Sequence, residues 1–389
     1  MVKIIIAVFL TFLADAHSVR TIFEDIEEYR IEFYKNFSMP TYTIDSLSKL
    51  QKEDPCAPYI PLVPDVRGLQ TVSEIKCKEY MWGLKNQLLK ENQREKCEAR
   101  RLLATYVPEK LHNGTTMAGD GYVGHGRAAK YAEFPHMGAV GWRCKDTAKK
   151  WVFKCGSSLI SDKFLLTAAH CTKLSPRFVS DIVNGDPEVV KLVVENILDD
   201  IGNEERRPKI AKIVNIIVHP EYKSPKKYND IALLEVDQAI EFTEFIKPAC
   251  IWPHKDMSLV GTKVTLTGWR ETETGQPATI LQAGDVEILD THTCDSVLKP
   301  FHNRNWQGFT DKQMCAGKPA GRVDTCKGDS GGPLSIRLEG YDFISLHLVV
   351  GVTSFGIQCS VRDRPGVYTR VASYVDWIEE RVWNYTSKF

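Results

Sequence analysis

Short runs of apolar and β-branched residues, separated by Gly, Pro and Asp, fill the chain from about residue 123 to its end. Runs of this length, bounded by turn residues, predict the short strands of a β-sandwich or β-barrel. The clearest runs are Phe164–Thr167, Ile213–Val218, Lys263–Thr267 and Leu348–Thr353. In this half of the chain only Tyr374–Trp383 predicts a helix, because Tyr374, Ile378 and Val382 recur at helical spacing on one face. We expect this helix to dock on a barrel.

The chain before residue 123 follows a different pattern. A proline-rich stretch around Pro55–Pro64 leads into a charged stretch, Val72–Leu103, that predicts a helix. Met117–Arg127 is rich in glycine, which is typical of a flexible and exposed joint. We therefore place a boundary at this joint and expect separate regions over residues 17–122 and 123–389.

The first 16 residues carry the features of a secretory signal peptide. Lys3 precedes about ten apolar residues, and Ala14–Ala16 supplies a small-x-small cleavage signal. The alternative is a membrane anchor, but an anchor needs about 20 apolar residues and this run is shorter. We therefore expect a secreted, extracellular protein with a signal peptide over residues 1–16. In that compartment three Asn-x-Ser/Thr sequences are glycosylation candidates: Asn36, Asn113 and Asn384.

Composition narrows the function classes. Hydrophobic residues make up 43% and charged residues 26% of the chain, which excludes a wholly disordered or fibrous protein. Fifty basic residues balance fifty acidic ones, so the net charge gives no reason to expect a nucleic acid or a membrane as partner. Eleven cysteines predict disulfides in an exported chain, and the odd number leaves one thiol free or bonded to another chain.

Three segments together carry a candidate chemistry: Thr167–Cys171, Tyr228–Leu234 and Cys326–Pro333. They contribute one histidine, one aspartate and one serine, namely His170, Asp230 and Ser330. A serine hydroxyl is a weak nucleophile at neutral pH, so acyl transfer needs a base within hydrogen-bond reach and a third group that orients the base. The three residues supply these three chemical functions.

These segments resemble the signature blocks of the chymotrypsin-like, or trypsin-type, serine proteases, in that family's order of histidine, aspartate and serine. The resemblance implies an all-β fold of two barrels with a C-terminal helix. It also implies that residues 17–122 are a disulfide-tethered pro-region and that residues 123–389 are the protease domain. Further matching segments are Glu133–Met137, Gly156–Leu159, Gly268–Trp269 and Pro365–Tyr368.

The resemblance implies a catalytic role for each candidate. Ser330 would attack the scissile carbonyl, His170 would relay the proton, and Asp230 would hold the histidine in the correct tautomer. The backbone N–H groups of Gly328 and Ser330 would form the oxyanion hole. The chain is thereby expected to be a serine endopeptidase.

The resemblance also implies a substrate preference. Asp324 lies six residues before Ser330, at the position that forms the floor of the primary pocket in trypsin-like members. A carboxylate there favours a cationic side chain, so we expect cleavage after Arg or Lys. The pocket walls and the preceding substrate-binding strand would come from Gly356, Gly366, Ser354 and Phe355.

Matching positions in the family imply three disulfides in the protease domain: Cys155–Cys171, Cys294–Cys315 and Cys326–Cys359. Cys250 resembles the cysteine that tethers a pro-region to the protease domain. Its expected partner is Cys77, with Cys97 as the competing choice. Cys56, Cys144 and the cysteine that the tether leaves over have no assigned partner.

In this family, activation frees an amino terminus that pairs with the aspartate before the catalytic serine. Counting back from the matching segments places that terminus at Val123 and makes Asp329 its partner. The residue before the cut is then Tyr122, which predicts activation by a chymotrypsin-like protease. Cleavage after Arg127 is the alternative, but Ala128 would then arrive five residues late for the aspartate.

The long pro-region and the matching segments resemble arthropod haemolymph cascade proteases, which act in immunity, melanisation or development. This pro-region is clip-like at most, because it has three cysteines and no adjacent pair. The resemblance implies protein substrates with Arg or Lys before the scissile bond, an upstream activating protease and a serpin-type inhibitor. The alternatives are a digestive or venom trypsin and a catalytically silent homologue that acts as a cofactor.

We expect no metal and no cofactor. Gly119–Gly124 matches a dinucleotide-binding pattern, but it follows no strand and opens no helix. The chain contains neither a Cys-x-x-Cys pair nor a His-Glu-x-x-His zinc motif. Acidic pairs such as Asp199–Asp200 and Glu204–Glu205 are candidates for a calcium-binding loop, although the chain has no EF-hand spacing.

Overall fold

The computed structural model describes residues 54–69, 71–103, 127–129, 132–174, 179–192, 196–197, 208–243, 245–269, 279–317, 330–338, 346–356 and 364–384. The chain divides into two compact units. Residues up to 61 and 86–108 form the first unit, and residues 62–85 and 109–389 form the second. No helix among the described residues is long and apolar enough to cross a membrane.

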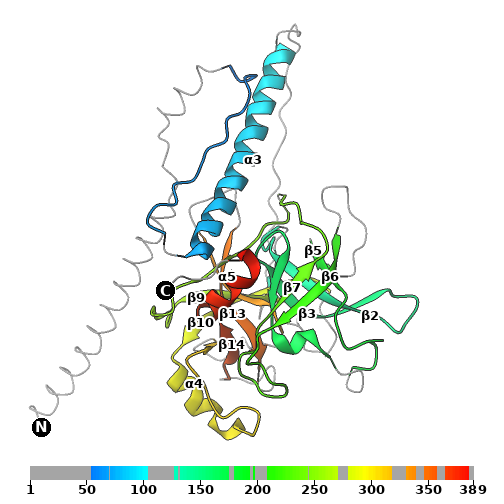
Figure 1. The fold of residues 1–389 in the computed structure, drawn as a ribbon, viewed down its shortest axis with the longest axis vertical. Helices are drawn as coiled ribbons and strands as arrows, with labels where there is room; N and C mark the ends of the chain where they lie inside the picture. Colours follow the sequence, from blue (N-terminus) through cyan, green and yellow to red (C-terminus); the bar gives the residue numbers. More distant parts are fainter. Residues whose placement is uncertain are drawn as a thin grey trace, which may run out of the picture. The chain divides into compact units, whose positions relative to one another are not determined.

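The second unit contains a closed antiparallel barrel whose strands pair in the order β2–β3–β4–β7–β6–β5 (Figure 1). Alternation is clear in β6, where Ala211 and Ile213 are buried while Lys212 and Val214 are exposed. The strands are β2 (Met137–Arg143), β3 (Trp151–Leu159), β4 (Phe164–Thr167), β5 (Val189–Leu192), β6 (Lys209–Val218) and β7 (Ala232–Val236).

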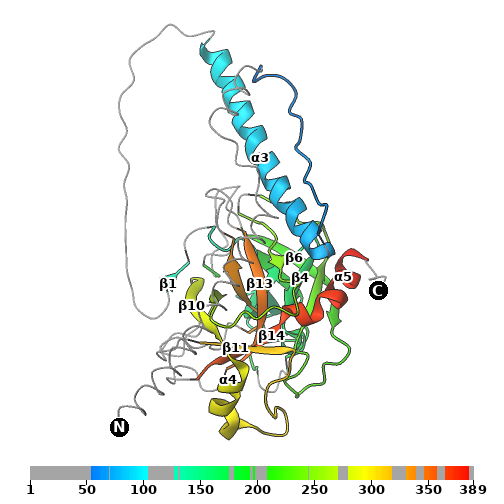
Figure 2. The same cartoon turned by 90° about the vertical axis from the view of Figure 1, so that its left-hand side faces the viewer.

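A second antiparallel barrel follows in the chain, and its strands pair in the order β10–β11–β14–β13–β12–β9, closed by pairing of β9 with β10 (Figure 2). Two short strands join its edges: β1 (Arg127–Ala128) on β10 and β8 (Cys250–Ile251) on β13. The barrel strands are β9 (Lys263–Gly268), β10 (Gln282–Leu289), β11 (Gln313–Gly317), β12 (Pro333–Arg337), β13 (His347–Phe355) and β14 (Gly366–Arg370). The expected all-β fold of two barrels is confirmed.

The predicted C-terminal helix is also confirmed. A 3-10 turn, η3 (Val371–Tyr374), leads directly into α5 (Val375–Trp383). Val371, Tyr374 and Ile378 are buried in the core of the first barrel. The helix ends at Asn384, whose left-handed backbone (φ 53°) caps the last turn.

The prediction of a single helix in this half is wrong, because the structure also contains α4 (Thr291–Leu298). Asp290 caps its N-terminus by accepting a hydrogen bond from the Thr293 backbone N–H, at 2.7 Å. A 3-10 turn, η2 (Lys299–Phe301), follows it. Eight residues give too few repeats of the helical period to separate this segment from a loop in the sequence.

The predicted helix over residues 72–103 is confirmed as α3 (Val72–Leu103). Its N-terminus carries a capping box: the Thr71 backbone N–H donates to Glu74 Oε2 (2.8 Å), and the Glu74 backbone N–H donates to Thr71 Oγ1 (3.2 Å). Residues 72–85 of this helix belong to the second unit. There Cys77 is disulfide-bonded to Cys250, and Met81 is buried.

In the first unit, the extended segment 54–61 lies against residues 86–103 of α3. A disulfide joins Cys56 to Cys97. The Tyr59 hydroxyl donates to Asn86 Oδ1 at 2.7 Å, and Gln93 Nε2 donates to the Ala57 carbonyl at 3.0 Å. The joint over residues 117–126, where the domain boundary is expected, lies outside the described residues, so that boundary stays a prediction.

Candidate active site

His170 lies on a 3-10 turn, η1 (Ala169–Thr172), that begins two residues after β4 ends. The disulfide between Cys155 and Cys171 fixes this turn to β3. The His170 backbone N–H donates to Asp230 Oδ1 at 2.9 Å, and its Nδ1 lies 2.8 Å from Asp230 Oδ2. Because Nδ1 is engaged with the carboxylate, Nε2 is the ring nitrogen that faces other groups.

Asp230 is the buried centre of this arrangement, with 1% of its side chain exposed. It lies just before β7, and the Ser354 hydroxyl from β13 also donates to its Oδ2. Burial by itself would raise the pKa of Asp230, but the neighbouring imidazole and the donated hydrogen bonds hold that pKa below its ordinary value. The carboxylate is therefore ionised at neutral pH and fixes the orientation of the His170 ring.

Two residues that the sequence patterns did not connect with the site support the backbone of residues 229 and 230. Thr369 Oγ1 donates to the Asp230 carbonyl at 2.9 Å. The Tyr374 hydroxyl donates to Asn229 Oδ1 at 2.9 Å, and Asn229 has a left-handed backbone with φ of 53°. Both contacts come from elements more than 130 residues away. No local sequence signal predicts them.

Ser330 lies at the seam between the two barrels. Its carbonyl accepts a hydrogen bond from the Gly156 backbone N–H of β3 at 2.8 Å, and the Gly331 N–H donates to the Thr353 carbonyl of β13 at 2.9 Å. Gly331 has φ of +77°, and a Cβ there would lie 2.6 Å from the Gly156 carbonyl and would clash with Thr167. Glycine at this position therefore lets the serine approach the turn that carries His170.

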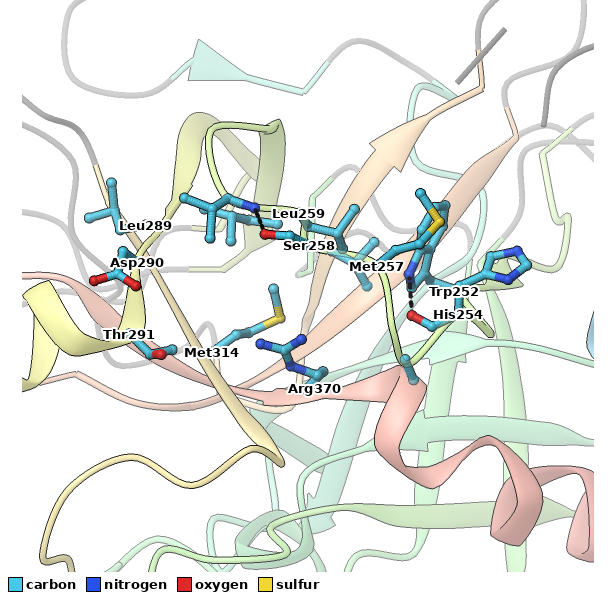
Figure 3. Close-up of a pocket in the computed structure, with 14 residues that line it drawn as sticks. Trp252, His254, Met257, Ser258, Leu259, Leu289, Asp290, Thr291, Met314 and Arg370 are labelled. Carbon is cyan, nitrogen blue, oxygen red and sulfur yellow. Dashed lines mark hydrogen bonds between the residues drawn. The ribbon is translucent and has the colours of Figure 1, made fainter. Parts of the chain in front are cut away.

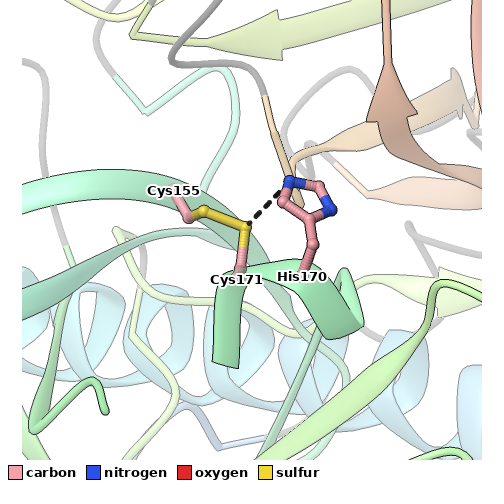
Figure 4. Close-up of side chains that lie close together, drawn as sticks. All are labelled: Cys155, His170 and Cys171. Carbon is pink, nitrogen blue, oxygen red and sulfur yellow. Dashed lines mark hydrogen bonds between the residues drawn. A yellow bond between two sulfur atoms is a disulfide. The ribbon is translucent and has the colours of Figure 1, made fainter. Parts of the chain in front are cut away.

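The structure brings His170, Asp230 and Ser354 together, and it forms no hydrogen bond between Ser330 and His170. His170 Nε2 lies instead 3.7 Å from Cys171 Sγ (Figure 4). Cys155, His170 and Cys171 form the one group of at least three potential metal ligands among the described residues. Both sulfurs are consumed in a disulfide, however, so they supply no thiolate for zinc.

The described part of the expected substrate site runs along the ends of β13 and β14. Ser354 and Phe355 end β13, Gly356 follows it, and Gly366 begins β14. Phe355 packs edge-on against Trp306, with ring centroids 5.4 Å apart. Several expected site residues lie outside the described residues: Tyr122, Val123, Asp324, Gly328, Asp329, and the sequence positions Asn36 and Asn113.

Three expected disulfides are present: Cys155–Cys171, Cys294–Cys315 and Cys77–Cys250. The fourth disulfide in the structure, Cys56–Cys97, uses two cysteines that the sequence left unassigned once Cys77 joins Cys250. Cys144 is free and half-buried. Cys326 and Cys359 lie outside the described residues, so their pairing stays a prediction.

A pair of buried imidazoles lies elsewhere in the same unit. The rings of His136 and His347 lie 4.8 Å apart, and His347 Nε2 contacts the Glu133 carbonyl at 2.8 Å. Burial lowers the pKa of His347 to about 4 and holds the pKa of His136 well below its ordinary value. Both rings are therefore neutral in the folded protein at neutral pH.

The structure also contains a separate cavity of about 230 Å³, and none of the expected site residues lines it. Trp252, Leu259, Met314 and Arg370 are among its lining residues (Figure 3). Burial lowers the pKa of Arg370, and its Nε forms no hydrogen bond with any residue that the structure describes. This cavity is thus distinct from the cluster around His170.

Comparison with known proteins places these features in context. A family model described as Trypsin matches residues 123–378. Serine protease snk of Drosophila melanogaster is 33% identical over 316 residues, which are 80% of this chain and 65% of that protein. Serine protease Hayan of Drosophila melanogaster is 33% identical over 258 residues, 64% of this chain and 37% of that protein. Phenoloxidase-activating factor 1 of Holotrichia diomphalia is 33% identical over 265 residues, 64% of this chain and 67% of that protein.

Proposed function

Because the chain belongs to the trypsin family of serine proteases, we propose that it is a serine endopeptidase with the triad His170, Asp230 and Ser330. The observation that carries the proposal is the 2.8 Å contact between His170 Nδ1 and the buried Asp230 carboxylate. That contact leaves Nε2 as the nitrogen that accepts a proton. It supports a general base beside the serine of the matching motif.

The proposed reaction proceeds through an acyl-enzyme. Ser330 Oγ forms a bond to the scissile carbonyl carbon while His170 Nε2 accepts the hydroxyl proton. His170 then donates this proton to the leaving amine, and the C–N bond breaks. Water attacks the ester with His170 again acting as base, which releases the acid and restores Ser330. The backbone N–H groups of Gly328 and Ser330 would stabilise the oxyanion in both steps.

The proposed specificity is cleavage after Arg or Lys. Asp324 would lie at the floor of the primary pocket and pair with the cationic side chain of the substrate. Gly356 and Gly366 would leave room along the pocket walls for a long side chain. The substrates would be proteins, because the Ser354–Phe355 strand end offers an extended backbone beside the triad.

The protein is proposed to be a zymogen. Cleavage after Tyr122 by an upstream chymotrypsin-like protease would free the Val123 ammonium to pair with Asp329. The disulfide between Cys77 and Cys250 supports a two-chain product, because it would hold the pro-region to the protease domain after cleavage. Glycans on Asn36, Asn113 and Asn384 belong to the same proposal of a secreted protein.

We place the enzyme in an extracellular proteolytic cascade of immunity, melanisation or development, with a serpin-type inhibitor. The names of the relatives support this placement, since one of them is a phenoloxidase-activating factor. A digestive or venom trypsin is opposed by the long pro-region. A catalytically silent cofactor is the alternative from another class, and it is opposed by the intact set of His170, Asp230 and Ser330.

The test isolates the full-length protein, activates it with chymotrypsin, sequences the new amino terminus and measures cleavage of matched Arg, Lys and Phe peptides. We expect a terminus at Val123 and cleavage of the Arg and Lys peptides. A Val123 terminus without turnover of any peptide would favour the silent cofactor. A terminus at Ala128 in active enzyme would contradict activation after Tyr122.

A further inference from the structure

Hydrogen bonds connect two loops beside the candidate active site. The Gln307 backbone N–H donates to the Tyr228 hydroxyl at 2.7 Å, and that hydroxyl donates to the Gly308 carbonyl at 3.1 Å. The Lys227 backbone N–H donates to the Asn305 carbonyl at 3.0 Å. Residues 223–228, which lead directly into Asp230, and residues 302–309 therefore form one wall, here called the loop wall.

Aromatic side chains next to the triad form the base of the loop wall. Phe355 follows Ser354, whose hydroxyl donates to Asp230. The Phe355 ring packs edge-on against Trp306, and Trp306 packs edge-on against Phe309 with centroids 5.2 Å apart. Phe355 is only half-buried, so part of its ring faces solvent next to the candidate triad. Aromatic surface of this kind supports an extended peptide without selecting one charge.

The charge on the loop wall is positive. Lys227 Nζ lies 5.5 Å from the centroid of the Phe355 ring, and Lys226 and Arg304 are exposed nearby in the same two loops. Among the residues that the structure describes, none of these three cations has a carboxylate within 4.0 Å. The contact with the Phe355 ring does not occupy Lys227 with an anion, so its ammonium group can pair with a carboxylate.

Two carboxylates on elements that flank these loops have partners of their own. Glu221 lies 3.0 Å from Lys312 Nζ, and that ion pair lowers the pKa of Glu221. Asp295 lies 3.2 Å from His302 Nε2. Neither carboxylate therefore neutralises Lys226, Lys227 or Arg304.

We propose that the loop wall binds an acidic side chain of the substrate, two to four residues before the scissile bond, and that Lys227 determines this preference. The proposal rests on the peptidase function proposed above. Phe355 directly precedes Gly356, which we assign to the primary pocket, so the residues before the cleaved Arg or Lys pass beside Phe355 and Lys227. A substrate with Asp or Glu there gains an ion pair with Lys227 while its backbone packs on the aromatic base.

The test compares paired peptides that carry Glu or Gln at one of three positions before a cleaved Arg, using the full chain activated before Val123. We expect kcat/KM to be about fivefold higher for the Glu peptide at one position, mainly through a lower KM. The ratio shrinks at high salt because the pair is screened. Lys227→Gln brings the ratio to one, and Lys227→Glu reverses it in favour of a Lys peptide. The exposed Lys149→Gln on the β2–β3 hairpin is the matched control and keeps the wild-type ratio.

A binding measurement separates this proposal from the peptidase function. Fluorescently labelled Glu and Gln peptides are titrated with activated Ser330→Ala protein, and fluorescence anisotropy gives their relative affinity. A Glu preference in binding without turnover by the wild-type protein would overturn the peptidase function and retain the acidic site. Turnover with a ratio of one, or a wild-type ratio in Lys227→Gln, would overturn the acidic site and retain the peptidase.

Discussion

Two buried carboxylates join distant parts of this chain by the same chemistry. Asp230 accepts hydrogen bonds from the His170 backbone N–H and the Ser354 hydroxyl. Glu379 on α5 accepts hydrogen bonds from the backbone N–H and the hydroxyl of Ser73, at 2.8 and 2.6 Å. Both side chains are almost fully buried, and both bind segments at least 60 residues away.

The difference is that Asp230 has a further partner, a histidine ring, which Glu379 lacks among the described residues. Asp230 also contacts the His170 ring, whose side chain is 24% exposed, so the buried charge is connected to a titratable group at the surface. Among the described residues, the Glu379 carboxylate instead accepts both of its hydrogen bonds from Ser73, which is 2% exposed and lies at the buried start of α3. In both places, therefore, a buried carboxylate holds two distant segments of the chain together. Only Asp230 also contacts a partly exposed imidazole, and this contact makes Asp230 a candidate for catalysis.

Removing the charge of each carboxylate separately distinguishes the roles of Asp230 and Glu379. We expect Asp230→Asn to reduce kcat by about 10⁴-fold, the loss that this change causes in a serine protease of the same family, because the His170 tautomer is no longer fixed. Rates per active site, measured on activated protein, give this number. Exposed Asp237→Asn is the matched control. A loss below tenfold for Asp230→Asn would contradict the proposed role.

The disulfide between Cys77 and Cys250, which attaches α3 to the protease domain, is expected to have the next largest effect. Replacing Cys77 and Cys250 together with Ala is expected to lower the free energy of unfolding by about 2–5 kcal/mol, because the disulfide closes a loop of 173 residues. Denaturant unfolding of the uncleaved protein measures it. Cys144→Ala, which removes the free and half-buried cysteine, should stay close to wild type. An unchanged midpoint in the double variant would show that the disulfide adds no stability.

The hydrogen bonds from Ser73 to Glu379 also hold the start of α3, and removing them is expected to have a smaller effect. Glu379→Gln is expected to lower the free energy of unfolding by about 1–3 kcal/mol, since two donors on Ser73 lose a charged acceptor. Activity per active site should change little, because Glu379 contacts neither His170 nor Asp230. Exposed Glu380→Gln on the next residue is the control. Equal midpoints for the two variants would argue against a role for Glu379 in stability.

The last prediction concerns pH and the buried imidazole pair of His136 and His347. The pKa of His347 is about 4 in the folded protein, so the unfolded chain binds its proton first as the pH falls. Stability should therefore fall between about pH 6.5 and pH 4, by about 1.4 kcal/mol per pH unit for each such histidine. Denaturant unfolding across this range gives the slope. His347→Gln should reduce the slope, whereas exposed His292→Gln should leave it unchanged.

The sequence predicted features that depend on neighbouring residues. The three motif blocks gave the candidates His170, Asp230 and Ser330. The apolar runs with their turns predicted a β-sandwich or β-barrel, and the resemblance to the protease family implied two barrels. The charged stretch of Val72–Leu103 predicted α3 with the bounds that the structure has. Each of these signals lies within one short segment of chain, so local pattern and composition were sufficient.

Contacts between residues far apart in the chain leave no local signal in the sequence and were not predicted. The contact between Ser73 and Glu379 joins residues 306 positions apart, and neither residue differs in type from many exposed ones. The supports of Asp230 from Thr369 and Tyr374 likewise appear only when β14 and α5 are folded against the first barrel. α4 was missed because a helix of eight residues shows little more than two turns of its period.

Active-site labelling of the activated protein with a fluorophosphonate, followed by mass spectrometry of the labelled peptide, tests the triad of His170, Asp230 and Ser330 directly. We expect one label per molecule on Ser330, loss of labelling in Ser330→Ala, and greatly slowed labelling in Asp230→Asn. Labelling of Ser330→Ala at the wild-type rate, or no labelling of an activated protein that begins at Val123, would contradict a catalytic triad of His170, Asp230 and Ser330.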